Sequence, residues 1–274
     1  MRLDGLRREW NKLTGPGRGL VLGGLLALPL ALLGATLLRH APEGAGSPGR
    51  APAAAPLQPP GPAEEQLVAQ ILEETNRTWG AQFARLKRSY QPSEPLLQTS
   101  LPPEACDRAP AAAGIFWCPA DARIYVDLTR VARLRQQGGE AGMLAIGYLL
   151  AHAAGHHVQQ QLGIIALVRG LQQRSQDPEE QRALWRRVEE QADCFAGLWA
   201  RGASQAQTAT TPGAVEAALA AAALDDARPL PPPTGYTAAT EAAAQGDIAE
   251  RATWFRTGME KGDYVACDSF GGLR

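Results

Sequence analysis

Apolar residues recur at helical spacing along most of the chain, and this pattern predicts a mainly helical fold. The predicted helices span residues 64–89, 129–136, 140–161, 164–174, 178–199, 212–223 and 238–260. The helix at 140–161 is apolar or small at almost every position from Met143 to Ala154, so we expect it to be buried nearly all round. The helix at 178–199 has a clear start, because Asp177 suits the N-cap and Pro178 suits the first helical position.

Two short apolar runs break the helical pattern. Residues 114–117 and 123–128 alternate like strands and are joined by Cys118-Pro119-Ala120-Asp121, a turn sequence, so they predict a β-hairpin. An exposed strand edge there could bind an extended peptide, although a small structural sheet is the commoner outcome. The expected fold class is therefore mainly α, with α+β character from one small hairpin.

The longest apolar stretch lies near the N-terminus. Residues 19–38 carry no charge and, at about 1.5 Å per residue, are long enough to cross the hydrocarbon core of a bilayer. Five basic residues precede the stretch: Arg2, Arg7, Arg8, Lys12 and Arg18. This flank predicts a cytoplasmic segment at 1–18, a transmembrane signal anchor at 19–38 and an exported C-terminal body. A cleavable signal peptide is the alternative, but the run is long for one and no small-x-small cleavage site follows it.

The rest of the chain divides into a linker and one domain. Residues 39–63 are rich in proline, alanine and glycine, which is typical of a tether, and a folded domain is expected over 64–274. The net charge of −1 argues against a nucleic-acid partner.

All four cysteines follow the apolar segment, and an even number in an exported body suggests disulfides. A structural zinc site is the rival interpretation, but the sequence has no C-x-x-C pair to support it. The spacing alone allows three pairings. Cys106 with Cys118 closes a short loop and is the first pair to expect, which leaves Cys194 with Cys267.

The strongest chemical signal is a pair of histidines on the buried helix. His152 and His156 are four residues apart and therefore share one helix face. This is the spacing of the zinc motif H-E-x-x-H, but Ala153 stands where that motif has the glutamate that activates water. Two such histidines alone are more often core residues than ligands. Glu189 and Asp193, four apart on a later helix, change this assessment, because a glutamate completes a catalytic zinc ligand set and a second carboxylate can orient a ligand histidine.

Several stretches around these residues match one known family in the same order. They are residues 116–121, 124–128, 155–159, 162–164, 191–197, 254–255, 262–263 and 267–268. On these motifs the chain resembles the bacterial neutral zinc metallopeptidases, which are signal-anchored in the inner (cytoplasmic) membrane and carry one extracytoplasmic zincin-like domain. The resemblance implies one Zn²⁺ held by His152, His156 and Glu189, with Asp193 in the second coordination sphere. It also supports extracytoplasmic disulfides, because the cysteine positions match.

The chain departs from the family pattern at two positions. Ala153 replaces the general base, whose loss typically slows catalysis about 10²–10⁴-fold. Gln245 stands where family members usually have a histidine, which would remove a second contribution if that histidine stabilises the oxyanion. The sequence therefore predicts a zinc-binding pseudo-peptidase that acts as a binding or scaffolding module in the cell envelope, with a peptide or protein ligand in its cleft. Two alternatives stay open: an active zinc metallopeptidase with a non-standard base, and a metal-free domain whose histidines are core residues.

Overall fold

The computed structural model describes residues 57–99, 106, 114–203, 206, 209, 211–223 and 247–271. The predicted anchor at 19–38, most of the predicted tether and Gln245 lie outside these residues. Within the described part of the chain, no helix combines the length and the apolar character needed to span a bilayer.

The described residues are mainly helical, as the sequence predicts. The α-helices are α2 (Pro62–Arg85), α4 (Leu128–Gln137), α5 (Gly139–Leu162), α6 (Ile164–Arg174), α7 (Pro178–Ala200), α8 (Ala214–Ala223) and α10 (Ile248–Lys261), followed by the 3-10 helix η2 (Tyr264–Cys267). The helix predicted at 238–260 is described only from Ile248 onward. The N-cap assignment is confirmed, since the Asp177 carboxylate accepts a hydrogen bond from the backbone N–H of Glu179 at the start of α7.

A three-stranded sheet of order β1-β3-β2 accompanies the helices. Strands β2 (Ile115–Trp117) and β3 (Ile124–Asp127) pair antiparallel, with Phe116 opposite Tyr125, which confirms the predicted hairpin. Strand β1 (Pro95–Gln98) pairs parallel with β3 and was not predicted. Proline is tolerated at the first residue of an edge strand, where its missing N–H matters least. Pro95 is therefore compatible with the start of β1, although a proline would interrupt a helix.

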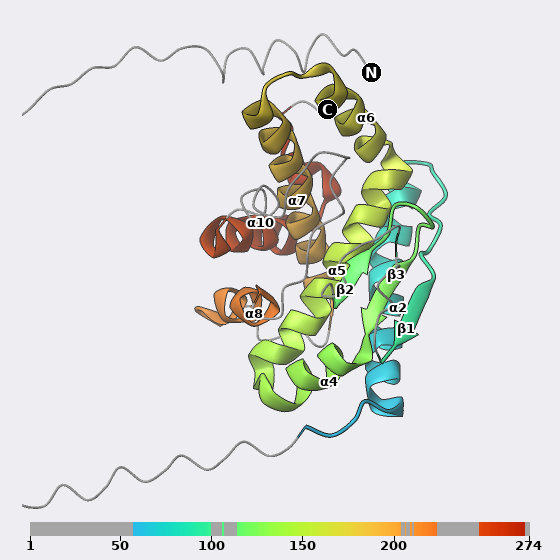
Figure 1. Cartoon of the computed structure of the whole chain (residues 1–274), viewed down its shortest axis with the longest axis vertical. Coiled ribbons are helices and arrows are strands. Elements are labelled where there is room, and N and C mark those ends of the chain that lie inside the picture. Colours follow the sequence, from blue (N-terminus) through green and yellow to red (C-terminus); the bar gives the residue numbers. More distant parts are fainter. Residues whose placement is uncertain are drawn as a thin grey trace, which may run out of the picture. The chain divides into compact units, whose positions relative to one another are not determined.

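Helix α5 lies between the sheet with α2 on one side and α7 with α8 on the other (Figure 1). Consequently nearly every residue from Leu144 to Gln159 is buried, in agreement with the all-round apolar pattern. The helix ends at Gly163, whose φ of 81° is in the left-handed region that glycine adopts without strain. The two predicted disulfides, Cys106–Cys118 and Cys194–Cys267, are both present.

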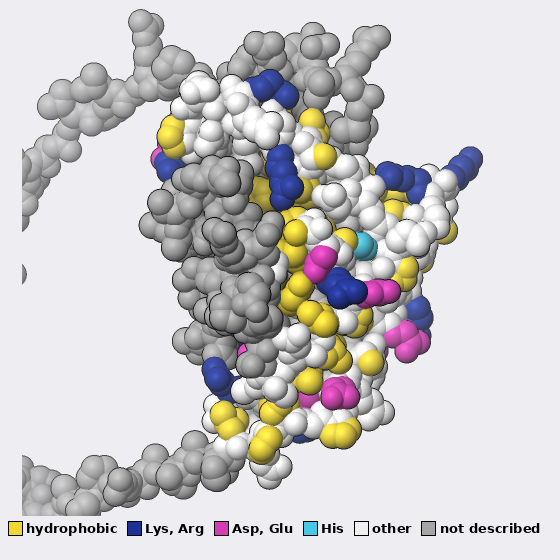
Figure 2. Space-filling model, turned by 45° about the vertical axis from the view of Figure 1, so that its right-hand side comes forward, with side chains coloured by type: hydrophobic (Ala, Val, Ile, Leu, Met, Phe, Trp, Pro, Cys, Tyr) yellow, Lys and Arg dark blue, Asp and Glu magenta, His cyan; other side chains and the backbone are white. Residues whose placement is uncertain are grey.

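Helices α7 and α10 cross with their backbones in contact. A Cβ atom placed on Gly197 or on Gly258 would lie 1.9 Å from a backbone oxygen of the opposite helix, so neither position has room for a side chain. This close approach brings the N-terminal half of α10, including Arg251, next to Asp193 on α7. On the face shown in Figure 2, acidic and basic side chains are scattered among apolar ones, and part of a histidine reaches the surface.

Candidate metal centre

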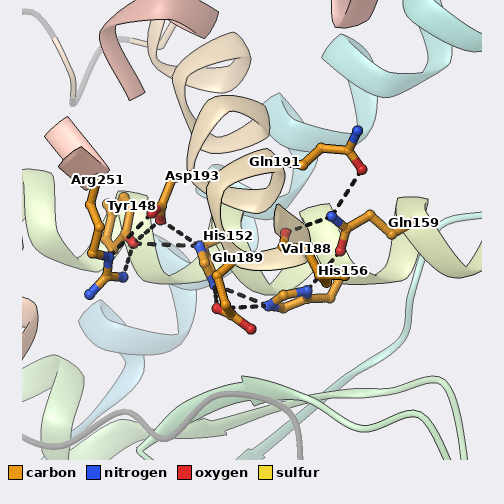
Figure 3. Close-up of polar contacts among 9 residues, drawn as sticks. All are labelled: Tyr148, His152, His156, Gln159, Val188, Glu189, Gln191, Asp193 and Arg251. Atoms are coloured by element: carbon orange, nitrogen blue, oxygen red, sulfur yellow. Dashed lines mark hydrogen bonds and ion pairs between the residues drawn. The ribbon is translucent and has the colours of Figure 1, made fainter. Parts of the chain in front are cut away.

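Helices α5 and α7 bring three potential metal ligands to one point (Figure 3). The Nε2 atoms of His152 and His156 are 3.0 Å apart, and Glu189 Oε2 lies 3.3 and 3.7 Å from them, respectively. Three ligand atoms bound to a tetrahedral zinc ion at about 2.0–2.1 Å would lie roughly 3.3 Å from one another, which is close to these separations. His156 and Glu189 are buried, whereas the His152 side chain remains 13% exposed, so the site reaches solvent at that histidine.

His152 is oriented by a buried carboxylate. Its Nδ1 lies 2.9 Å from Asp193 Oδ1, and Asp193 also accepts hydrogen bonds from the Tyr148 hydroxyl and, at 3.2 Å, from Arg251 Nε. Burial alone would raise the pKa of Asp193, but Arg251 and His152 outweigh it and hold that pKa below its usual value. Because a carboxylate only accepts, the Nδ1 of His152 carries a proton, and a neutral ring presents a lone pair on Nε2.

His156 is oriented by an amide. Its Nδ1 lies 2.8 Å from Gln159 Oε1, while Gln159 Nε2 donates to the backbone carbonyl of Val188 at 2.8 Å. That carbonyl can only accept a hydrogen bond, so it fixes which end of the Gln159 amide faces the histidine. The Nδ1 of His156 is therefore the protonated nitrogen, and its Nε2 also presents a lone pair toward Glu189.

These orientations suit a cation. Two imidazole lone pairs and one carboxylate converge within 4.8 Å, an arrangement that is repulsive unless a positive charge lies among them. In addition, Glu189 Oε1 is buried and has no hydrogen-bond partner among the described residues. Two histidines and a glutamate are a typical catalytic zinc ligand set, so the residues present fit Zn²⁺.

Without a metal, a bound proton can supply the positive charge that the site requires. Burial disfavours a charged imidazole, but the hydrogen bonds and charges of Asp193 and Glu189 outweigh it and raise the pKa of His152 to about 9. Burial likewise opposes ionisation of Glu189, but the two histidines hold its pKa far below the usual range. The zinc-free site is therefore expected to bind a proton at neutral pH.

The structure brings together the three predicted ligands and the predicted orienting carboxylate, namely His152, His156, Glu189 and Asp193. Ala153 is buried on α5, directly after the first histidine. The neighbouring His157 is not part of the site, since its Nε2 lies 2.7 Å from the backbone carbonyl of Gln91.

Three residues of the site were missed at the sequence level. Tyr148 and Gln159 lie four residues before His152 and three residues after His156 on α5, so helix-face spacing could have indicated both. Arg251 comes from α10, and no local pattern connects it to the histidines.

Comparisons with known proteins identify the family of this chain. The family described as "putative neutral zinc metallopeptidase" matches residues 11–270. The chain is 35% identical over 206 residues to uncharacterized protein YpfJ of Escherichia coli (strain K12), which covers 75% of this chain and 71% of YpfJ. It is 35% identical over 176 residues to uncharacterized protein Rv2575 of Mycobacterium tuberculosis (strain ATCC 25618 / H37Rv), which covers 60% of this chain and 58% of Rv2575. No solved structure matches the chain. The chain therefore belongs to the neutral zinc metallopeptidase family.

Proposed function

We propose that this protein is a membrane-anchored, zinc-binding pseudo-peptidase, which binds a peptide or protein without cutting it. The observation that carries the proposal is Ala153. It follows the first ligand, His152, directly on α5, at the position where H-E-x-x-H has its general base. Its methyl group is buried and cannot accept a proton.

Peptide hydrolysis at such a site needs more than a metal. A bound zinc ion would polarise the carbonyl of a peptide. A separate group must take a proton from the attacking water and deliver it to the leaving amine. The two carboxylates of the site are already engaged, because Glu189 faces both imidazoles and Asp193 accepts hydrogen bonds from His152, Tyr148 and Arg251. Loss of the base alone typically costs about 10²–10⁴-fold in rate.

The proposal includes a location. The domain would lie outside the cytoplasm of a bacterial cell, joined by the linker at 39–63 to an anchor at 19–38 in the inner membrane. Two features support this location. Basic residues precede the apolar run, and the domain contains two disulfides, which persist mainly in oxidising compartments.

An active metallopeptidase is the second candidate. The complete ligand set favours it, because both histidines retain the orienting hydrogen bonds that a working zinc site requires. This candidate needs a base from outside the H-E-x-x-H position.

Restoring the glutamate tests the proposal. Zinc content and hydrolysis of casein and of a quenched-peptide panel would be measured for the wild type, Ala153→Glu, Ala153→Gln and the double variant Ala153→Glu/His156→Ala. We expect one zinc per wild-type chain without hydrolysis, and zinc-dependent hydrolysis in Ala153→Glu only. Ala153→Gln is the matched control, because it has nearly the same shape as glutamate but no basic group.

Other results would decide against the proposal. Hydrolysis by the wild type that is abolished in His152→Ala would establish the active peptidase instead. A zinc stoichiometry near zero in protein purified without added metal would leave the histidines as core residues of a metal-free domain.

A further inference from the structure

A row of buried amides connects the metal site to the C-terminal segment. Figure 3 shows its first part, from His156 through Gln159 to Gln191. Gln159 Oε1 lies 2.8 Å from His156 Nδ1, and Gln159 Nε2 donates to Gln191 Oε1 at 3.1 Å as well as to the Val188 carbonyl. Gln191 Nε2 then donates to the backbone carbonyl of Cys267 at 3.0 Å. Both glutamine side chains are fully or almost fully buried, so water does not replace these bonds.

The direction of this row is fixed by its two backbone carbonyls. A carbonyl only accepts, so the Cys267 carbonyl requires the NH₂ group of Gln191, and the oxygen of Gln191 must face Gln159. The Val188 carbonyl likewise requires the NH₂ group of Gln159, whose oxygen is left to accept from His156. All these hydrogen bonds are satisfied together only when His156 carries its proton on Nδ1.

A disulfide holds the far end of the row. Cys267 in η2 is bonded to Cys194, which lies one helical turn after Gln191 on α7. The same segment is also held by Ser269, whose hydroxyl donates to the Arg187 carbonyl and whose carbonyl accepts from the Arg187 guanidinium. Loss of the disulfide would therefore loosen the Cys267 carbonyl without releasing the whole segment.

We infer that Gln159 and Gln191 are positioning residues for the ligand His156, and that the Cys194–Cys267 disulfide holds the carbonyl at which their relay ends. The relay selects the imidazole tautomer that offers Nε2 to a metal and fixes the ring toward Glu189. Groups in this role typically change metal affinity about 10–100-fold. The inference rests on the zinc site of the proposed function, but it is independent of whether the protein hydrolyses peptides.

Zinc affinity tests the relay. The dissociation constant of the full-length protein would be measured by competition with a chromophoric chelator for the wild type, Gln159→Met, Gln191→Met and the double variant. We expect Gln159→Met to weaken zinc binding about 10–100-fold. Gln191→Met should weaken it less, because Gln159 keeps its bond to Val188.

The double variant separates positioning from general destabilisation. Once Gln159 is replaced, Gln191 no longer acts on His156, so the double variant should bind zinc as Gln159→Met does. The matched control is Gln172→Met, which removes another buried amide whose NH₂ donates to a backbone carbonyl, that of Gln181, away from the site. It should lower stability and leave zinc affinity unchanged.

The disulfide is tested in two backgrounds. Replacing Cys194 and Cys267 with serine should weaken zinc binding several-fold in the wild type but not in Gln191→Met. The same replacement at Cys106 and Cys118 is the control and should have no effect.

Three results would overturn the inference. The first is that Gln191→Met binds zinc as tightly as the wild type. The second is that the two glutamine substitutions weaken zinc binding independently, so that their effects multiply in the double variant, and the third is that replacing Cys194 and Cys267 weakens zinc binding equally in the wild type and in Gln191→Met. If Gln159→Met fails to fold, Gln191→Met with the cysteine variants still decides the question. A wild type that binds no zinc would instead overturn the proposed function together with the inference.

Discussion

The Nε2 atoms of His152 and His156 face each other at 3.0 Å, and each ring already uses its Nδ1 as a hydrogen-bond donor. Two neutral rings in this position would direct lone pairs at one another and at the Glu189 carboxylate. The hydrogen bonds around the site thus maintain an arrangement that requires positive charge, which either a proton or a metal ion supplies.

We therefore expect zinc and a proton to compete. Because the pKa of His152 is raised to about 9, zinc binding at pH 7 should release about one proton, and affinity should rise by about tenfold per pH unit up to pH 9. In the zinc-free protein the raised pKa stabilises the fold fully below the unfolded value of about 6.5, and this contribution is lost as the pH rises through 9. Titration calorimetry in buffers of different ionisation enthalpy measures the proton release, and a zinc affinity that is flat across this range would contradict the expectation.

Arg251 should stabilise both the fold and the site. Arg251→Met removes the ion pair between Arg251 and the fully buried Asp193, together with the hydrogen bond from Arg251 to Tyr148. It leaves the His152 ring as the remaining cationic partner of that buried carboxylate in the zinc-free protein. We expect a loss of about 3–5 kcal/mol in the free energy of unfolding and at least about tenfold weaker zinc binding. Urea denaturation with EDTA present and chelator competition measure the two effects.

The control for this variant lies on the same helix. Arg256→Met removes a partly exposed ion pair with Glu216, so it should cost at most about 1 kcal/mol and leave zinc affinity unchanged. If the two arginine substitutions change stability and zinc affinity equally, the ion pair between Arg251 and Asp193 has no special role in either.

The parts of the site that the sequence predicted are those with local geometry. His152 with His156, and Glu189 with Asp193, are pairs four residues apart on one helix, and helix periodicity alone gives their shared faces. The start of α7 was predictable for a similar reason, since Asp177 and Pro178 have local preferences for the N-cap and the first helical position.

Features that depend on distant chain segments were not predictable in this way. Arg251 reaches Asp193 because α10 crosses α7 at two glycines. A glycine in a helix does not indicate which other helix packs against it. Strand β1 pairs parallel with β3, which leaves no hairpin signal, and the proline at its start obscured the short apolar run that follows.

The helix crossing should be sensitive to a single methyl group. Gly258→Ala places a Cβ atom at 1.9 Å from the Cys194 carbonyl oxygen, so α10 must move away from α7. We expect a loss of about 1–3 kcal/mol in stability, together with weaker zinc binding, because the same shift withdraws Arg251 from Asp193. Gly80→Ala in α2 is the control: nothing lies within 4 Å of its added Cβ, and alanine there should stabilise the protein by about 0.5–1 kcal/mol. If Gly258→Ala is destabilised but binds zinc with normal affinity, the metal site does not depend on the crossing of α7 and α10.

Glu190 should make stability depend on pH. Burial and the adjacent Glu250, with which it shares a side-chain hydrogen bond, raise the pKa of Glu190 to about 7, with Arg187 and Arg186 acting weakly in the opposite direction. The protonated carboxyl therefore contributes stability below the unfolded pKa of about 4.5, and this contribution is lost as the pH rises through 7.

Glu190→Gln cannot ionise and should stabilise the fold by about 1–2 kcal/mol at pH 8, a value reduced for solvent screening of a half-buried group, and by almost nothing at pH 5. Urea denaturation of the zinc-free protein at both pH values measures this difference. An equal effect of Glu190→Gln at the two pH values would mean that Glu190 is already ionised at pH 5, and that the carboxyl pair does not hold its proton.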